Sequence, residues 1–300
     1  MLEKLKECPV CGHNHFKDFK TCKDYTVSKE LFNIVSCESC GFKFTNPRPT
    51  QETIGAYYKS EEYVSHTNSK KGIINTIYQI VRKRTLKEKV SLINSLVPNK
   101  GKILDMGCGT GFFLQACKND GWKISGIEPD EDARKLAKQN TDSVINADIF
   151  CCYDELDAFD IVTTWHVVEH IHKLNESIAK VNQVLKSGGI FIIAVPNPGS
   201  KDAEMYQENW AAYDVPRHLY HFNQSSINQL LQKHNFELIA TKPMVFDSYY
   251  VSMLSEKNIG RDINKGINYF KAFSNGLKSN NWAKENNNNY SSLIYIFKKK

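Results

Sequence analysis

Residues 103–113 of the chain read ILDMGCGTGFF, an apolar run that ends in an acidic residue and three glycines. The apolar run predicts a buried strand, and the segment after the glycines predicts a helix. Gly107, Gly109 and Gly111 allow a tight turn between them and let a ligand approach the backbone at the start of that helix. Because their spacing is G-x-G-x-G and residue 112 is Phe, the dinucleotide pattern G-x-G-x-x-G is absent and a dinucleotide is the weaker interpretation.

From this stretch onward, apolar runs of strand length alternate with segments of helical periodicity. The predicted strands are 102–107, 122–130, 142–148, 159–165 and 188–197. This alternation indicates an α/β fold with a parallel sheet that helices cover on both faces. Ligands bind such sheets beyond the C-terminal ends of the strands, so the candidate functional residues are sought at those ends.

Acidic residues stand at the ends of three predicted strands, at Asp105, Glu128 and Asp148. A carboxylate at Glu128, 21 residues after Gly107, can accept hydrogen bonds from both hydroxyls of a ribose. Together with the glycine turn, this order resembles class I S-adenosylmethionine-dependent methyltransferases over about residues 101–240. The resemblance implies a doubly wound, mostly parallel, seven-stranded Rossmann-like sheet and an enzyme that uses S-adenosylmethionine.

The same resemblance assigns roles around the cofactor. Asp105 and the glycine turn are expected to lie along the methionine part, Glu128 to hold the ribose, and Asp148 to contact the adenine amine. The residues expected in the turn are Gly107, Cys108, Gly109 and Gly111. An alternative of another class is a protein that binds the cofactor without catalysis, and the intact set of glycines and acids argues against it.

The resemblance also predicts how the chain closes, since this family usually ends with a helix and two antiparallel strands. Residues 224–235 fit the helix, 236–243 fit one strand and 291–297 fit the last. The stretch 243–290 is then an insertion with a helical segment and four consecutive asparagines at 286–289, typical of a surface loop.

Near the N-terminus the pattern C-x-x-C-G occurs twice, as CPVCG at 8–12 and CESCG at 37–41. Two cysteines at this spacing can bind one tetrahedral ion, and the glycine relieves the backbone at the turn. The predicted ligands of a zinc ion are Cys8, Cys11, Cys37 and Cys40. A site with four sulfur ligands has no open position, so its role is structural. His13, His15 and Cys22 are expected to be bystanders.

The motifs divide the chain into three predicted parts. Residues 1–50 form a zinc-ribbon module that is too small to fold without metal. Residues 51–100 form a helical linker or cap, with helical apolar spacing from Ile73 to Ile93. Residues 101–300 form the methyltransferase domain, which includes the insertion.

The segment HVVEH follows the strand predicted at 159–165. Relatives in the family that methylate base amino groups often carry Asn/Asp-Pro-Pro-Tyr here, and this chain does not, so HVVEH resembles the small-molecule enzymes. His166, Glu169 and His170 are therefore candidates for a catalytic base or a metal contact. In the alternative interpretation, Glu169 and His170 cap the next helix and His166 lines the cofactor pocket.

A second histidine-rich segment, YDVPRHLYHF at 213–222, follows the fifth strand. With the N-terminal cysteines it is similar to sugar C-methyltransferases of nucleotide-linked keto sugars, which carry His-Glu-His-Leu-x-Tyr-Phe-Ser here. The alignment puts His218 on the base of that family, Arg217 on its Glu and His221 on its Tyr. It implies that His218 is the catalytic base, and a histidine that only bonds to backbone is the alternative. Arg217 is expected to meet a phosphate or carboxylate of the acceptor.

Composition limits the partners. No apolar run approaches the length of a membrane span, and the start of the chain has no apolar signal core, so a cytoplasmic protein is expected. The net charge is +6, and residues 1–100 hold 17 Lys and Arg against 10 Asp and Glu. That basic third keeps an RNA base methyltransferase open as the runner-up. The leading hypothesis is methyl transfer to a small-molecule acceptor such as a sugar or other metabolite.

Overall fold

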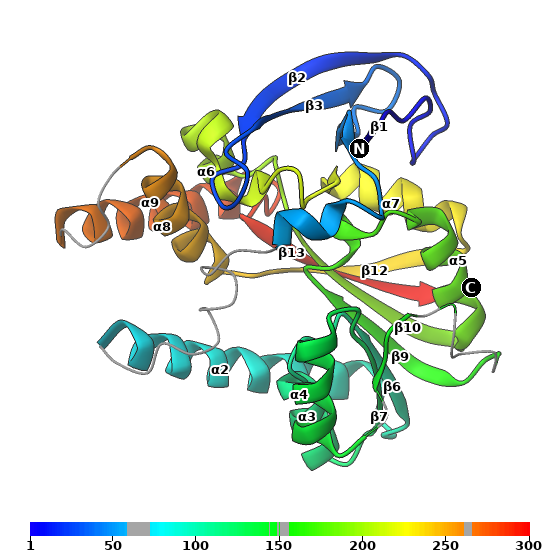
Figure 1. The fold of residues 1–300 in the computed structure, drawn as a ribbon. Helices are drawn as coiled ribbons and strands as arrows, with labels where there is room; N and C mark the ends of the chain where they lie inside the picture. The colour runs from blue at the N-terminus through cyan, green and yellow to red at the C-terminus, as the bar shows by residue number, and fades with distance from the viewer. Residues whose placement is uncertain (59–72, 144, 149, 151–155, 261–265) are drawn as a thin grey trace.

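The structure, a computed structural model, describes residues 1–58, 73–143, 145–148, 150, 156–260 and 266–300. Its central sheet has seven strands in the order β12-β13-β10-β9-β6-β7-β8 within this described part (Figure 1). The strands are β6 (Lys102–Met106), β7 (Lys123–Ile127), β8 (Ile145–Asn146), β9 (Phe159–Trp165), β10 (Leu185–Pro196), β12 (Phe236–Pro243) and β13 (Ser292–Lys299). Only β13 runs antiparallel to its neighbours, so the predicted fold class is confirmed.

Successive residues of a strand point to opposite faces of the sheet. Here both faces are apolar and are covered by helices. Ile103 of β6 packs with α2 (Ile73–Leu96) and α3 (Phe112–Asn119). Leu104 packs on the other face with α5 (Leu174–Val184) and α7 (Gln224–Lys233). Helix α4 (Glu131–Thr141) packs on α3. The predicted long helix, the closing helix and the two closing strands are all present. The strand order reverses between β6 and β9, where such sheets bind their ligands.

The insertion forms two helices that lie side by side, α8 (Asp247–Asn258) and α9 (Gly266–Glu285) (Figure 1). They are tied to the sheet through Asp202 of α6 (Lys201–Tyr206). This buried carboxylate accepts hydrogen bonds from Ser279 of α9 and from Ser291, both at 2.6 Å. At the start of α8, Asp247 lies 3.2 Å from His166, which follows β9, so α8 begins at the end of the sheet that bears the ligand crevice.

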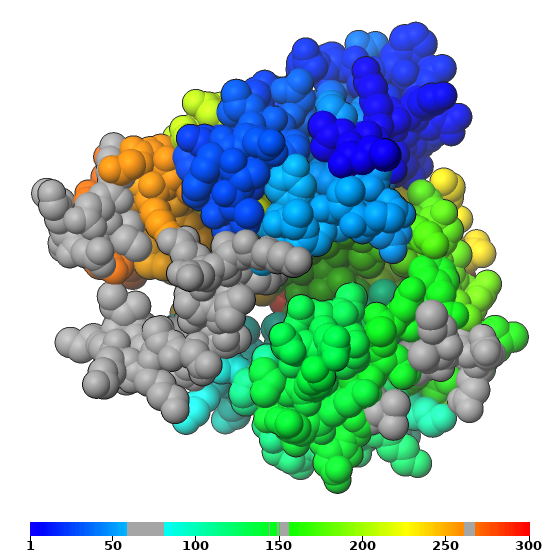
Figure 2. Space-filling view, viewed as in Figure 1, coloured from blue at the N-terminus to red at the C-terminus, as the bar shows by residue number. Residues whose placement is uncertain are grey.

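The N-terminal residues form a small antiparallel sheet over one end of the molecule (Figure 2). Its strands are β2 (Phe16–Lys23), β3 (Leu31–Cys37), β4 (Lys43–Thr45) and β11 (Tyr220–His221), in the order β11-β4-β3-β2. A separate pair joins β1 (Leu2–Glu3) to β5 (Arg48–Pro49). The boundary at residue 50 stays a prediction, but strand pairing crosses it, because β11 belongs to the segment 213–222. No helix within the described residues is long and apolar enough to cross a membrane.

Candidate active site and metal centre

The glycine turn follows β6 and leads into α3. Gly107, Gly109 and Gly111 all have positive φ, at 70°, 55° and 81°. A side chain at Gly107 would strike Val167 at 2.4 Å, so this glycine is required by packing. A side chain on Gly109 would meet no atom within 4 Å. Gly109 is therefore the position at which a ligand can approach the turn.

The three acids lie where the strand ends place them. Glu128 follows β7, and its carboxylate accepts the amide hydrogen of Gly109 at 2.8 Å. Burial raises the pKa of Glu128 in spite of that hydrogen bond. Burial also raises the pKa of Asp105 to about 7, and Thr163 donates to its carboxylate at 2.6 Å. Asp148 is half-buried and accepts from the amide of Phe150. The structure brings Glu128 into contact with the turn, and the assigned roles of the three acids stay predictions.

Sequence reasoning gave no role to Lys89 of α2, whose ammonium lies 4.0 Å from the centre of the Trp165 ring. Burial lowers the pKa of Lys89 to about 8, and the nearby Asp105 and Asp247 oppose this. Lys89 also lines a cavity of about 430 Å³ between α2 and the 242–247 segment. Helical periodicity could place Lys89 on a helix, but nothing in the sequence indicated that this helix borders the crevice.

Glu169, His170 and His218 converge at the end of β9. One donor atom of each side chain lies within 4.8 Å of the others. The two histidine rings pack edge to face with their centres 4.6 Å apart. Nδ1 of His218 lies 2.9 Å from the carbonyl oxygen of Ala212, and Nδ1 of His170 lies 3.0 Å from that of Arg217. The Tyr58 hydroxyl also lies 3.0 Å from Nδ1 of His170. We assign the Nδ1–H tautomer to both rings because each Nδ1 faces a carbonyl oxygen, so Nε2 is the nitrogen of each ring that can accept a proton.

The Glu169 carboxylate is fully buried, and neither of its oxygens has a hydrogen-bond partner among the described residues. The interpretation that Glu169 and His170 cap the following helix is wrong. They lie in a short 3-10 turn, η2 (Val168–His170), and α5 begins after Lys173 without any side-chain cap. Burial lowers the pKa of His170 to about 4, and His218 adds to the effect. His170 is therefore neutral at pH 7.

His166 adopts a positive φ of 57°, a strained conformation for a residue other than glycine. Its Nε2 lies 3.2 Å from Asp247 at the start of α8, and its Nδ1 lies 3.5 Å from Glu169. Burial would lower the pKa of His166, but the two carboxylates raise it to about 10. A protonated imidazole cannot accept a proton, so His166 is a weaker candidate for the base than His170 or His218. Sequence reasoning missed Asp247 because the insertion carried no motif.

Arg217 does not face the crevice, which corrects the expectation that it meets an anionic group of the acceptor. Its guanidinium is buried and donates to Asp24 at 3.0 Å and to Asp214 at 2.6 Å. It also donates to the carbonyl oxygen of Tyr57. The charge of Arg217 is therefore neutralised inside the protein. His221, which the alignment put on the family's Tyr, is buried and contacts the Thr45 hydroxyl.

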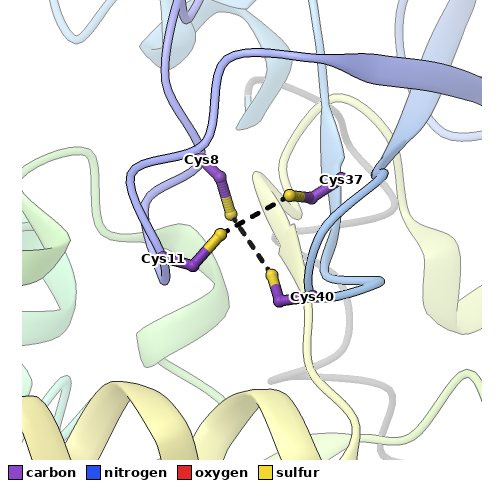
Figure 3. Close-up of side chains that lie close together, drawn as sticks. All are labelled: Cys8, Cys11, Cys37 and Cys40. Atoms are coloured by element: carbon purple, nitrogen blue, oxygen red, sulfur yellow. Dashed lines mark hydrogen bonds between the residues drawn. The ribbon is translucent and has the colours of Figure 1, made fainter.

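The four cysteines predicted as zinc ligands lie together (Figure 3). The sulfur atoms of Cys8 and Cys40 are 3.6 Å apart, as are those of Cys11 and Cys37. A tetrahedral ion with Zn–S bonds of about 2.3 Å would separate its sulfurs by about 3.8 Å, so the four thiols fit zinc. In both knuckles the glycine amide donates to the carbonyl of the first cysteine at 2.9 Å. Among the described residues, this cluster includes none of the three bystanders.

Comparisons with known proteins agree with this architecture. A sequence-family profile described as "Methyltransferase domain" matches residues 78–241. A "Ubiquinone biosynthesis O-methyltransferase" of Rickettsia typhi is 26% identical over 74% of this chain and 93% of its own length. The mitochondrial protein of that name from Rattus norvegicus is 34% identical over 32% of this chain and 31% of its own. A solved structure from Galdieria sulphuraria is described as a sarcosine dimethylglycine methyltransferase. The match covers 74% of this chain and 86% of the solved chain, with a TM-score of 0.50 and 12% sequence identity. At that identity the likeness shows the fold alone.

Proposed function

The chain belongs to the methyltransferase-domain family and is a class I S-adenosylmethionine-dependent methyltransferase, and on that premise we propose that it methylates a small molecule bound beside His218. One observation carries the proposal. Val167 packs against Gly107, so HVVEH touches the glycine turn, and His218 lies against His170 of that segment. The predicted donor and acceptor sides of the crevice are therefore adjacent.

In an in-line displacement, some residues of the crevice would bind the cofactor and others would position and deprotonate the acceptor. The sulfonium of the bound cofactor supplies an electrophilic methyl group, and the protein aligns the acceptor with it. The glycine turn and Glu128 hold the cofactor on one side. On the other side, Nε2 of His218 accepts the proton of the acceptor hydroxyl or acidic carbon, because Nδ1 is fixed on Ala212.

The acceptor class follows from the relatives and from the absent amino-methylase motif. The relatives named ubiquinone biosynthesis O-methyltransferase transfer to oxygen, which supports a hydroxyl acceptor here. A keto sugar with an acidic carbon is the second small-molecule candidate. The deciding experiment is transfer of tritiated methyl from S-adenosylmethionine to three panels: phenols and catechols, nucleotide-linked sugars, and total RNA.

Label in either small-molecule panel supports the proposal, and label in RNA alone overturns it in favour of the RNA base methyltransferase. Salt-sensitive RNA binding by the full chain would accompany that second outcome, because neutralised phosphates release counterions. Heat-denatured protein gives the background in each panel.

A second role for the same side chains is favoured by the buried Glu169 carboxylate, which makes no hydrogen bond in the described part of the chain and has the His166 ring 3.5 Å away. With one ring nitrogen each from His170 and His218, it offers a divalent cation two nitrogens and a carboxylate. A cation held there would lower the pKa of a hydroxyl bound to it. The Nδ1 contacts of both histidines to backbone carbonyls are those that metal-binding histidines ordinarily make.

The Glu169→Gln variant distinguishes a cation from a base acting alone. If a cation takes part, turnover after mild chelation should recover on addition of Mn²⁺, and the variant should need at least about tenfold more Mn²⁺ than the wild type. Zinc content, measured in parallel, must stay constant in both proteins. Turnover that is indifferent to Mn²⁺ in the wild type leaves His218 as the base without a cation.

We also propose that the four-cysteine cluster holds a structural zinc ion. The Cys37→Ser variant should lower the zinc content by at least about half and unfold the N-terminal sheet, because a sulfur ligand is lost from a module with little core. Atomic emission of the purified protein measures the zinc. The matched control is Cys22→Ser, since Cys22 is equally buried and lies outside the cluster. A Cys37→Ser protein with full zinc content would falsify the ligand assignment.

A further inference from the structure

We propose that the N-terminal sheet is the template that positions His218, and that Thr45 and Asp24 are positioning residues for methyl transfer. The inference rests on the proposed role of His218 in turnover. Residues 217–221 form one continuous segment, and every one of them is bound by a residue from the first 50. The fold therefore uses the zinc-bearing sheet to hold the loop that carries the base candidate.

Strand pairing fixes the C-terminal part of the segment. Tyr220 and His221 form β11 and pair with Phe44 and Lys43 of β4. Tyr220 also accepts a hydrogen bond on its hydroxyl from Arg48, at 2.8 Å. Because β4 pairs in turn with β3, which ends at the zinc ligand Cys37, the loop is two strands away from the cysteine cluster.

Thr45 holds the base candidate itself. Its hydroxyl donates to the carbonyl oxygen of His218 at 2.7 Å, and its amide donates to that of Leu219 at 3.0 Å. Thr45 is fully buried, so water cannot replace the hydroxyl. On the other side of the loop, the amide of Leu219 donates to the carbonyl oxygen of Glu169 at 2.8 Å. The His218 backbone is thus clamped between the N-terminal sheet and the HVVEH segment.

Asp24 holds the residue before the base candidate. Its carboxylate accepts from Arg217 at 3.0 Å and from the amides of residues 26–28, so it is itself fixed by the turn after β2. Burial would raise the pKa of Asp24, but Arg217 and those amides lower it below its usual value. Arg217 in turn binds Asp214, whose carbonyl oxygen accepts from the amide of His218. The Asp24 carboxylate therefore helps to hold the turn that carries His218, through Arg217 and Asp214.

The Thr45→Val variant tests the hydrogen bond from Thr45 to the His218 carbonyl oxygen. Valine keeps the shape and the backbone amide of threonine but lacks its hydroxyl. We expect kcat to fall about tenfold or more, because a base misplaced by a fraction of an ångström loses alignment. Zinc content and the Kd for S-adenosylmethionine should stay unchanged. Thr45→Ser should restore most of kcat. The matched control is Thr21→Val, because the Thr21 hydroxyl donates to Asn33 within the N-terminal sheet, and this variant should keep wild-type kcat.

Hydrogen exchange of the peptide 214–222 gives a reading that needs no turnover. Exchange should quicken in Thr45→Val, in Asp24→Asn and after zinc is removed from the wild type, while residues 102–106 of the central sheet stay protected. Unchanged exchange of 214–222 in all three would overturn the proposal, as would full kcat in Thr45→Val. If the wild type has no methyl-transfer activity at all, the proposed function fails, and the exchange data still decide whether the sheet holds the loop.

Discussion

Replacing Gly109 with valine should abolish binding of S-adenosylmethionine, with a loss of at least about 100-fold in affinity, or about 2.7 kcal/mol. The reason lies in the space around the glycine. A side chain there meets no protein atom within 4 Å, and Glu128 contacts the backbone beside it. The Cβ of valine therefore meets no protein atom, but the side chain would fill the volume that we propose for the cofactor. Calorimetric titration with S-adenosylhomocysteine measures the loss without requiring an acceptor.

The control separates loss of binding from loss of folding. Gly109 has a φ of 55°, so a side chain costs about 1–2 kcal/mol of stability in addition to any effect on the ligand. Gly260 has a φ of 78° and equally open surroundings, but lies at the end of α8 away from the turn. Gly260→Val should lower Tm as Gly109→Val does and leave affinity unchanged. If both variants bind like the wild type, the glycine turn is not the cofactor site.

Local spacing was sufficient to predict those parts of the molecule that a few neighbouring residues build. The two C-x-x-C-G knuckles and the glycine turn are such parts, because each is a tight turn whose glycines are needed within a short stretch. The sheet followed from alternating strands and helices, and its crevice from the rule that ligands bind at strand ends. These features depend on periodicity and turn chemistry, which a sequence displays directly.

Long-range partnerships were not predictable in the same way. Arg217 pairs with Asp24, which lies 193 residues away in the sequence. The residues around neither side chain indicate that the two form an ion pair. The alignment placed Arg217 in the acceptor loop, where an unpaired cation would meet the substrate, but burial required a carboxylate partner. The pairing of β11 with β4 was missed for a related reason: a two-residue strand shows no alternation. Asp247 and Lys89 lie on helices that border the crevice. The periodicity of those helices does not indicate which part of the sheet they pack against.

The two nitrogens of His218 have separate tasks in this geometry, which permits a variant that removes one of them. Nδ1 is engaged with the carbonyl oxygen of Ala212 at 2.9 Å and holds the ring. Nε2 lies 4.0 Å from Asp214, and the ring belongs to the cluster with Glu169 and His170. Asparagine can reproduce the donor at Nδ1 but has no atom at the place of Nε2. His218→Asn thus keeps the hydrogen bond that holds the loop and removes the proposed base.

His218→Asn should lower kcat by about 10²–10⁴-fold, the usual contribution of a general base, and leave the affinity for S-adenosylmethionine within about twofold. Stopped assays with tritiated cofactor measure turnover, and calorimetry measures affinity. His234→Asn is the matched control, because His234 bonds to Asn175 at the start of α5, outside the His218 cluster, and should keep full turnover. A His218→Asn protein with wild-type kcat would exclude His218 as the base. The neutral His170, which lies in the same cluster, would then be the remaining candidate to accept the proton.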